Sequence, residues 1–135
     1  MGVEWLKGRT CTRVFGYSPS DFRFEFGDGT LHAEGLWRVI DGGAVVLTSR
    51  DHGQRYGLPA PVDAIEQASA RLQGHRVSDV TLTEASADLI IVFEAGQRLE
   101  LLTETSGFES WTFTALGVHL VACCGGGVAD FGTGV

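Results

Sequence analysis

Hydrophobic and polar residues alternate along much of this chain, and the alternation predicts β-strands. In residues 21–26 three phenylalanines alternate with charged residues, so an extended strand would place the rings on one face and the charges on the other. The following Gly27-Asp28-Gly29 predicts a tight hairpin turn, and residues 30–34 then return as the next strand. Residues 88–94 are apolar at both alternating sets of positions. This pattern is typical of a central strand that is covered on both faces.

The two halves of the chain follow one plan. Glycine, valine, aspartate, phenylalanine and tryptophan recur in the same order in residues 8–49 and 74–131, with insertions only at expected turns. The matching positions are Gly8, Val14, Asp21, Phe26, Gly29, Trp37 and Gly43 in the first half and Gly74, Val80, Asp88, Phe93, Gly96, Trp111 and Gly117 in the second. The sequence therefore predicts two tandem repeats of about five strands each, in meander order.

One segment between the repeats has helical periodicity. Pro59 and Pro61 precede residues 62–73, apolar residues follow at helical spacing, and Gly74 provides a stop. We expect a single domain over residues 1–135 that is mainly β, or α+β by strict count. Its two β-meander repeats, joined by one helix, would form a sandwich or flattened barrel and leave a frayed tail at 132–135.

Composition narrows the classes of partner. The chain has 135 residues and a net charge of −7, which repels phosphate backbones and anionic lipids, so we expect no nucleic acid and no membrane as partner. No apolar run approaches the ~20 residues of a membrane-spanning helix. The first residues lack the pattern of a signal peptide, and a cytoplasmic location is expected. A basic protein is compatible with the charge, and unpaired sheet edges invite a homodimer.

The glycine run, the histidines and the cysteines of this chain lack the neighbouring residues or spacings that cofactor and metal sites require. The Gly125-Gly126-Gly127 run has no helix predicted after it and no lysine beside it, which favours a turn over a phosphate-binding loop. The four histidines are scattered, and the three cysteines lack zinc or redox spacings. We therefore expect no cofactor, no metal and reduced cysteines, with Cys123 and Cys124 on opposite faces of a strand.

The densest group of reactive side chains lies in the polar loop of residues 50–58. His52 could act as a general base there, with Arg55 and Tyr56 beside it, although a solvated loop is the simpler interpretation. Trp37 and Trp111 occupy equivalent positions of the repeats. They are either core residues or the walls of a groove in which Arg38 and Arg55 bind an anion.

A C-terminal segment of about a quarter of the chain carries a resemblance, and the rest agrees only in pattern. Gly107-Phe108-Glu109-Ser110-Trp111, followed by an apolar strand and the triple-glycine turn, resembles the C-terminal signature of small uncharacterised bacterial β-rich proteins. The resemblance implies a domain of unknown function and assigns no catalytic residue. The first half has Gly35-Leu36-Trp37 without the Glu-Ser pair, so the symmetry is broken at Glu109 and in the loop of residues 50–58.

Two functions remain open at this point. The first is a non-enzymatic binding or protein-interaction module, immunity-type or adaptor-like, with a basic partner. The alternative is a small-molecule-binding or hydrolytic site around the His52 loop and the Trp37/Trp111 pair. The absence of catalytic motifs favours the first, and the candidate contact residues are His52, Arg55, Tyr56, Arg38, Trp37, Glu109 and Trp111.

Overall fold

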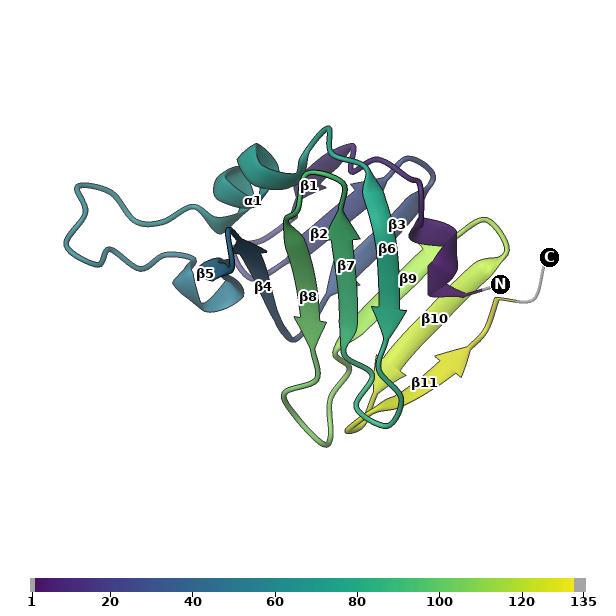
Figure 1. Ribbon diagram of the computed structural model, residues 1–135. Helices are drawn as coiled ribbons and strands as arrows, with labels where there is room; N and C mark the ends of the chain where they lie inside the picture. The colour runs from purple at the N-terminus through teal and green to yellow at the C-terminus, as the bar shows by residue number, and fades with distance from the viewer. Residues whose placement is uncertain (1, 133–135) are drawn as a thin grey trace.

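The computed structural model describes residues 2–132 and shows two antiparallel sheets packed face to face (Figure 1). The first sheet has six strands in the order β1 (Arg13–Phe15), β2 (Phe22–Phe26), β3 (Gly29–Ala33), β9 (Trp111–Ala115), β10 (Val118–Cys123) and β11 (Gly127–Asp130). The second has five strands in the order β5 (Ala44–Thr48), β4 (Leu36–Asp41), β8 (Arg98–Leu102), β7 (Leu89–Phe93) and β6 (Val77–Leu82). The sheets do not close into a barrel, so the mainly β sandwich is confirmed.

Alternation in β2 has the expected consequence. Phe22, Phe24 and Phe26 are buried between the sheets, whereas Arg23 and Glu25 lie on the outer face. The rings of Phe22 and Phe24 pack edge-to-face against Trp37, with ring centroids 5.2 and 5.3 Å apart. Each aromatic side chain buried in this way removes about 150–250 Å² of surface from water.

The prediction for residues 88–94 is wrong in one respect. Leu89, Ile91 and Phe93 are buried, but Ile90 and Val92 are only half-buried on the outer face of the five-stranded sheet. The sandwich has two layers, so a strand of either sheet has only one face in the core. Apolar residues on the other face therefore remain partly accessible.

The helices lie at the margins of the sandwich. A 3-10 turn, η1 (Val3–Leu6), precedes β1, a second one, η2 (Ser49–Asp51), follows β5, and α1 (Ala64–Leu72) contacts β1 and β5. The helix starts two residues later than predicted, because Asp63 is its N-cap and accepts a hydrogen bond from the backbone N–H of Glu66 at 3.1 Å. Of the predicted tail, Gly132 bonds to Asp130, and residues 133–135 lie outside the described residues.

Each half of the chain contributes strands to both sheets. The first half gives β1, β2 and β3 to the six-stranded sheet and β4 and β5 to the other, while the second half gives β6, β7 and β8 to the five-stranded sheet and β9 and β10 to the first. Strand β11 has no counterpart in the first half. Each half is thus a meander that changes sheets after its third strand, as expected if a twofold relation connects the halves.

Backbone hydrogen bonds at the junction of the halves have the same twofold pattern. Gly8 N donates to Val77 O at 2.9 Å, and the equivalent Gly74 N donates to Cys11 O at 2.8 Å. Likewise Cys11 N donates to His75 O at 2.9 Å and Val77 N to Arg9 O at 2.8 Å. The correspondence therefore extends from strand order to individual bonds.

Among the described helices, none combines the length and the apolar character needed to cross a membrane.

Candidate functional site

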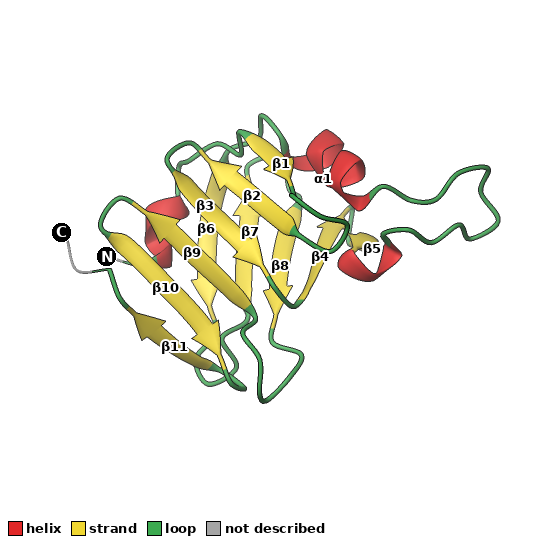
Figure 2. Cartoon of the chain, turned by 180° about the vertical axis from the view of Figure 1, so that it is seen from behind, coloured by secondary structure: helices red, strands yellow, loops and turns green. Residues whose placement is uncertain are grey.

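The outer face of the six-stranded sheet carries polar and aromatic side chains that line a hollow, and Figure 2 shows this sheet in front. Its register places residues of β1, β2, β3, β9, β10 and β11 directly opposite one another, and cross-strand partners share a face. One row across the face consists of Phe15, Arg23, His32, Thr112, Val121 and Ala129.

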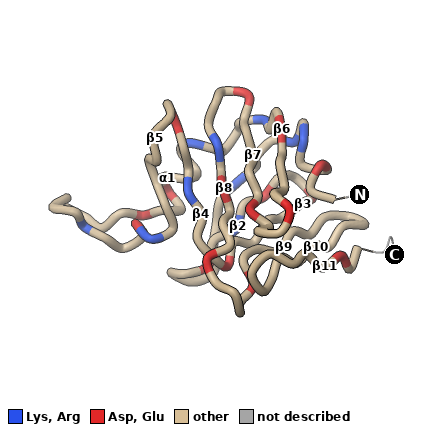
Figure 3. Tube along the Cα trace, turned by 60° about the horizontal axis from the view of Figure 1, so that its bottom comes forward, with Lys and Arg blue, Asp and Glu red and all other residues tan. Residues whose placement is uncertain are grey.

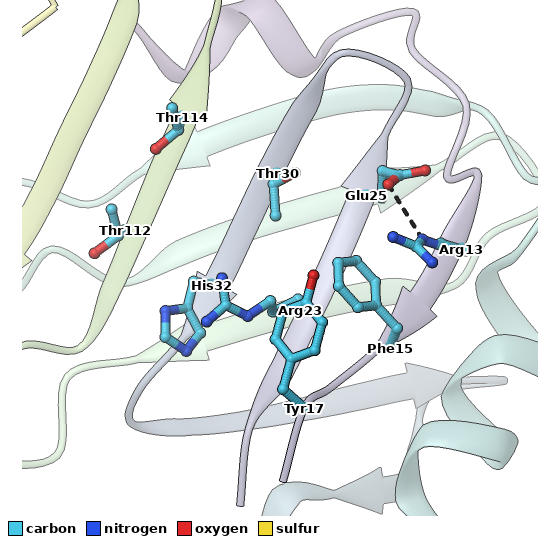
Figure 4. A pocket seen from close by; sticks show the side chains of 9 residues that line it. All are labelled: Arg13, Phe15, Tyr17, Arg23, Glu25, Thr30, His32, Thr112 and Thr114. Carbon is cyan, nitrogen blue, oxygen red and sulfur yellow. Dashed lines mark hydrogen bonds and ion pairs between the residues drawn. The ribbon is translucent and has the colours of Figure 1, made fainter.

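A hollow of about 420 Å³, here called the polar hollow, lies over β1, β2, β3 and β9 (Figure 4). Threonine hydroxyls from β3 and β9 line one side of it, and the aromatic rings of Phe15 and Tyr17 line the other. Strand pairing between β3 of the first half and β9 of the second brings the two sides together.

Ion pairs fix the charged groups of the polar hollow. Arg13 Nε lies 3.2 Å from a carboxylate oxygen of Glu25, and Asp21 Oδ1 lies 3.1 Å from Arg23 Nε and 2.9 Å from His32 Nε2. Burial acts to raise the pKa of Asp21, but the backbone N–H of Tyr17, the Arg23 guanidinium and His32 outweigh it and hold this pKa below its usual value. The arginines of this hollow are therefore already paired with acids.

A second hollow of about 490 Å³, here called the apolar hollow, lies over β10 and β11. Val121, Val128, Ala129 and Phe131 give it an apolar lining, and Phe131 is 61% exposed. Exposed apolar surface of this kind in a concave site favours contact with an apolar group of a partner.

The two hollows meet at an acidic border. Thr112 of the polar hollow is the cross-strand partner of Val121 of the apolar hollow, and its hydroxyl donates to Glu34 Oε2 at 3.1 Å. A hydrogen bond to Glu34, the charge of Glu34 and slight burial raise the pKa of Glu109, which lines the apolar hollow, and His32 opposes this shift. Two carboxyl groups thus share this border without a basic side chain within ion-pair distance of either in the described residues.

We expect Glu109→Gln to raise the free energy of unfolding at neutral pH. The folded-state pKa of Glu109 is raised, so the native state binds its proton more tightly, and stability falls as the pH rises from the ordinary value of a glutamate through the folded-state pKa. Glutamine keeps a donor for Glu34 but carries no charge. Urea unfolding measured between acidic and neutral pH should show a small difference in unfolding free energy between Glu109→Gln and the wild type, and this difference should disappear on acidification. A difference that does not vary with pH, or that Glu84→Gln reproduces, would contradict the interaction between Glu34 and Glu109.

His52 has a structural role, because it binds the start of α1 and packs against the core. His52 Nδ1 accepts a hydrogen bond from the backbone N–H of Ala64 at 3.0 Å, and its ring packs edge-to-face on Phe22 with centroids 5.5 Å apart. The histidine thereby ties the loop to the start of α1. A neutral imidazole has one acceptor nitrogen, and here that nitrogen, Nδ1, is occupied by the Ala64 N–H while Nε2 carries the proton, which weakens the hydrolytic interpretation.

Arg55 and Tyr56 lie on a loop that projects from the sandwich (Figure 1). Arg55 Nη1 donates to Pro59 O at 3.0 Å, and the Tyr56 hydroxyl donates to Asp51 at 2.7 Å, which raises the pKa of Tyr56. Both side chains are exposed. They do not converge with the tryptophans.

The expectation that Trp37 and Trp111 wall a groove is wrong. Both indoles are fully buried, because β4 and β9 turn these positions toward the facing sheet. Arg38, the neighbour of Trp37, points to the outer face of the five-stranded sheet, where its Nε lies 2.6 Å from Glu100. Arg38 and Trp37 therefore lie on opposite sides of one sheet and cannot share a ligand.

The cysteines also differ from the prediction. Cys123 and Cys124 are joined by a disulfide, and Cys11 is a buried free thiol. Strand β10 ends at Cys123 and Cys124 has a φ of 61°, so strand alternation does not separate their side chains. Burial raises the pKa of Cys11 to about 12, which keeps this thiol protonated at neutral pH.

Sequence reasoning missed the rows of the outer face. It placed Arg23 and Glu25 on a wet face, but it could not align β3 with β9, which lie about 80 residues apart. Glu109 was singled out, and its neighbour Glu34 was not. Within residues 2–132 no group of three or more His, Cys, Asp or Glu side chains could hold a metal ion.

Comparison with known proteins gives no relative for this chain: no protein-family model, no curated protein and no solved structure matches it. The resemblance to small bacterial β-rich proteins therefore stays a prediction.

Proposed function

We propose that this protein is a non-enzymatic binding module that holds a basic and apolar segment of a partner protein on the outer face of its six-stranded sheet. The observation that carries the proposal is the acidic border between the two hollows, where Glu34 and Glu109 meet beside Val121. A lysine or arginine placed there would relieve the repulsion between the carboxylates, and an apolar neighbour would fill the apolar hollow.

Net charge supports the same class of partner. The chain has a formal net charge of −7, and acidic positions are spread over the loops of the sandwich in Figure 3. A negative surface speeds the approach of a basic protein and disfavours an acidic one. An immunity-type or adaptor role fits this chemistry, and the cytoplasmic location stays a prediction.

The polar hollow supports orientation of the partner segment. Its threonine hydroxyls and its paired arginines are held by the sheet and by ion pairs, so they offer fixed donors and acceptors. An extended segment crossing β3, β9 and β10 would meet polar groups first and the apolar hollow afterwards.

A peptide titration tests the proposal. We expect acetyl-Leu-Arg-Leu-Arg-amide at millimolar concentration to shift the backbone NMR signals of Thr112, Val121 and Ala129, and added salt should weaken the effect because the contact is electrostatic. The double variant E34Q/E109Q should lose most of this response.

The control peptide is acetyl-Leu-Glu-Leu-Glu-amide, which has the same length and apolar content. Equal shifts with both peptides, shifts confined to other surfaces, or a response that survives E34Q/E109Q would each refute the proposed binding face.

A further inference from the structure

The loop between η2 and α1 forms an ordered projection, here called the arm, which comprises residues 53–62. Its base is closed by two hydrogen bonds, from Gly53 N to Val62 O and from Val62 N to Gln54 O, both 2.8 Å long. At its tip Leu58 N donates to Arg55 O at 2.7 Å. The arm is therefore held in one shape by its own backbone bonds.

The tip of the arm presents side chains typical of protein contacts. Tyr56 is 67% exposed and Leu58 is 51% exposed, and Arg55 stands beside them. Tyrosine and arginine, with tryptophan, are enriched among the residues that dominate binding energy at interfaces. Tyr56 and Gly57 have left-handed φ values of 48° and 78° in a turn closed by the bond from Leu58 N to Arg55 O, and this bond restrains the tip before docking.

The arm has the chemistry that the proposed binding face requires. Arg55 is a cation suited to the acidic border of Glu34 and Glu109, and it is the only basic residue in the sequence of the arm. Tyr56 and Leu58 are apolar groups suited to the apolar hollow, whose volume is about 490 Å³. Glu34 raises the pKa of Glu109, and no basic side chain of the described residues lies within ion-pair distance of either carboxyl group.

The arm cannot reach the apolar hollow, which lies over β10 and β11, within its own chain. Figures 1 and 2 place the arm at one end of the molecule and β11 at the opposite end, in both views. Any contact between the two surfaces must therefore join two copies. Two such contacts related by a twofold axis would close a dimer.

We infer that the protein self-associates through these surfaces, with Arg55, Tyr56 and Leu58 of one copy docked at Glu109 and the apolar hollow of another. The inference rests on the proposed binding face and names one occupant for it. In this dimer the arm competes with a basic partner segment for the same hollow.

Sedimentation of the purified protein at several concentrations tests the inference. We expect about twice the monomer mass at high concentration. Arg55→Glu should weaken association about tenfold or more, since it turns a charge attraction into a repulsion. Tyr56→Ala with Leu58→Ala should weaken it as well, because the apolar hollow then stays unfilled.

Charge exchange provides the decisive control. Arg55→Glu and Glu109→Arg should each be monomeric alone and should associate when mixed, because both contacts in the mixed dimer then pair opposite charges. Lys7→Glu makes the same charge change as Arg55→Glu at an exposed site outside the arm and the hollow, and it should leave association intact.

A wild-type chain that remains monomeric, or variants that fail to associate on mixing, would overturn the inference. If the Arg-containing peptide still shifts Thr112 and Val121 in such a monomer, the proposed function stands and only self-association fails. Thermal unfolding of each variant separates loss of contact from loss of fold.

Discussion

Replacing Gly16 by alanine is expected to destabilise the protein by about 3 kcal/mol, the upper part of the usual cost of overpacking. An added Cβ would overlap the backbone carbonyl of Asp21 and lie 3.1 Å from Ile65 Cδ1. The overlapped group is backbone, so it cannot rotate away. The strain would also displace Asp21, the carboxylate that pairs with Arg23 and His32 in the polar hollow.

Gly107→Ala is the matched control for this change. Gly107, like Gly16, does not hold a left-handed φ, and its added Cβ would have no neighbour within 4 Å. We expect a change within about 1 kcal/mol, in the stabilising direction, because alanine restricts the unfolded chain. Urea unfolding followed by tryptophan fluorescence measures both variants. Equal midpoints would show that the Gly16 site is not tightly packed.

Trp111→Phe is expected to cost about 1–2 kcal/mol more than Trp37→Phe, the usual difference that follows when a buried hydrogen bond is lost. Trp111 Nε1 donates to the carbonyl of Ala87 at 2.9 Å inside the core, and phenylalanine would leave that oxygen without its donor. Trp37 Nε1 is buried without a partner, so its removal relieves an unsatisfied group.

The pair is well matched because both indoles are fully buried at equivalent positions of the two halves. The loss of ring volume is the same in both variants, so the two substitutions differ chiefly in the hydrogen bond. Denaturant midpoints with an unchanged slope would report the difference directly. A larger loss at Trp37 would mean that its indole nitrogen has a partner in solution.

Local sequence patterns were sufficient for the strands, the helix and the class of fold. Alternation in β2 identified its buried phenylalanines, and Pro61 and Gly74 bracketed α1. Each of these signals depends on residues within a few positions of one another. The error at Ile90 and Val92 arose because periodicity does not reveal how many layers cover a sheet.

The candidate site was accessible to sequence reasoning only in part. Glu109 and the loop with Arg55 and Tyr56 were singled out because the repeats differ there. The pairing of Glu34 with Glu109 and of Thr112 with Val121 depends on long-range register, which a single sequence does not contain. The interpretation of the tryptophans failed for the same reason, since it required knowing which face of β4 and β9 meets the other sheet.

Because each half contributes strands to both sheets, the order of strands affects how fast this chain folds. In the six-stranded sheet β3 pairs with β9, and in the five-stranded sheet β4 pairs with β8. Neither sheet can therefore form completely until strands that are far apart in the sequence pair with each other. Closing such long loops costs entropy before any pairing offsets it, which slows folding. A chain cut within the arm would leave two fragments, each with an incomplete set of strands for both sheets. We expect neither fragment to form this sandwich alone and expect ordered structure only when the two fragments bind each other.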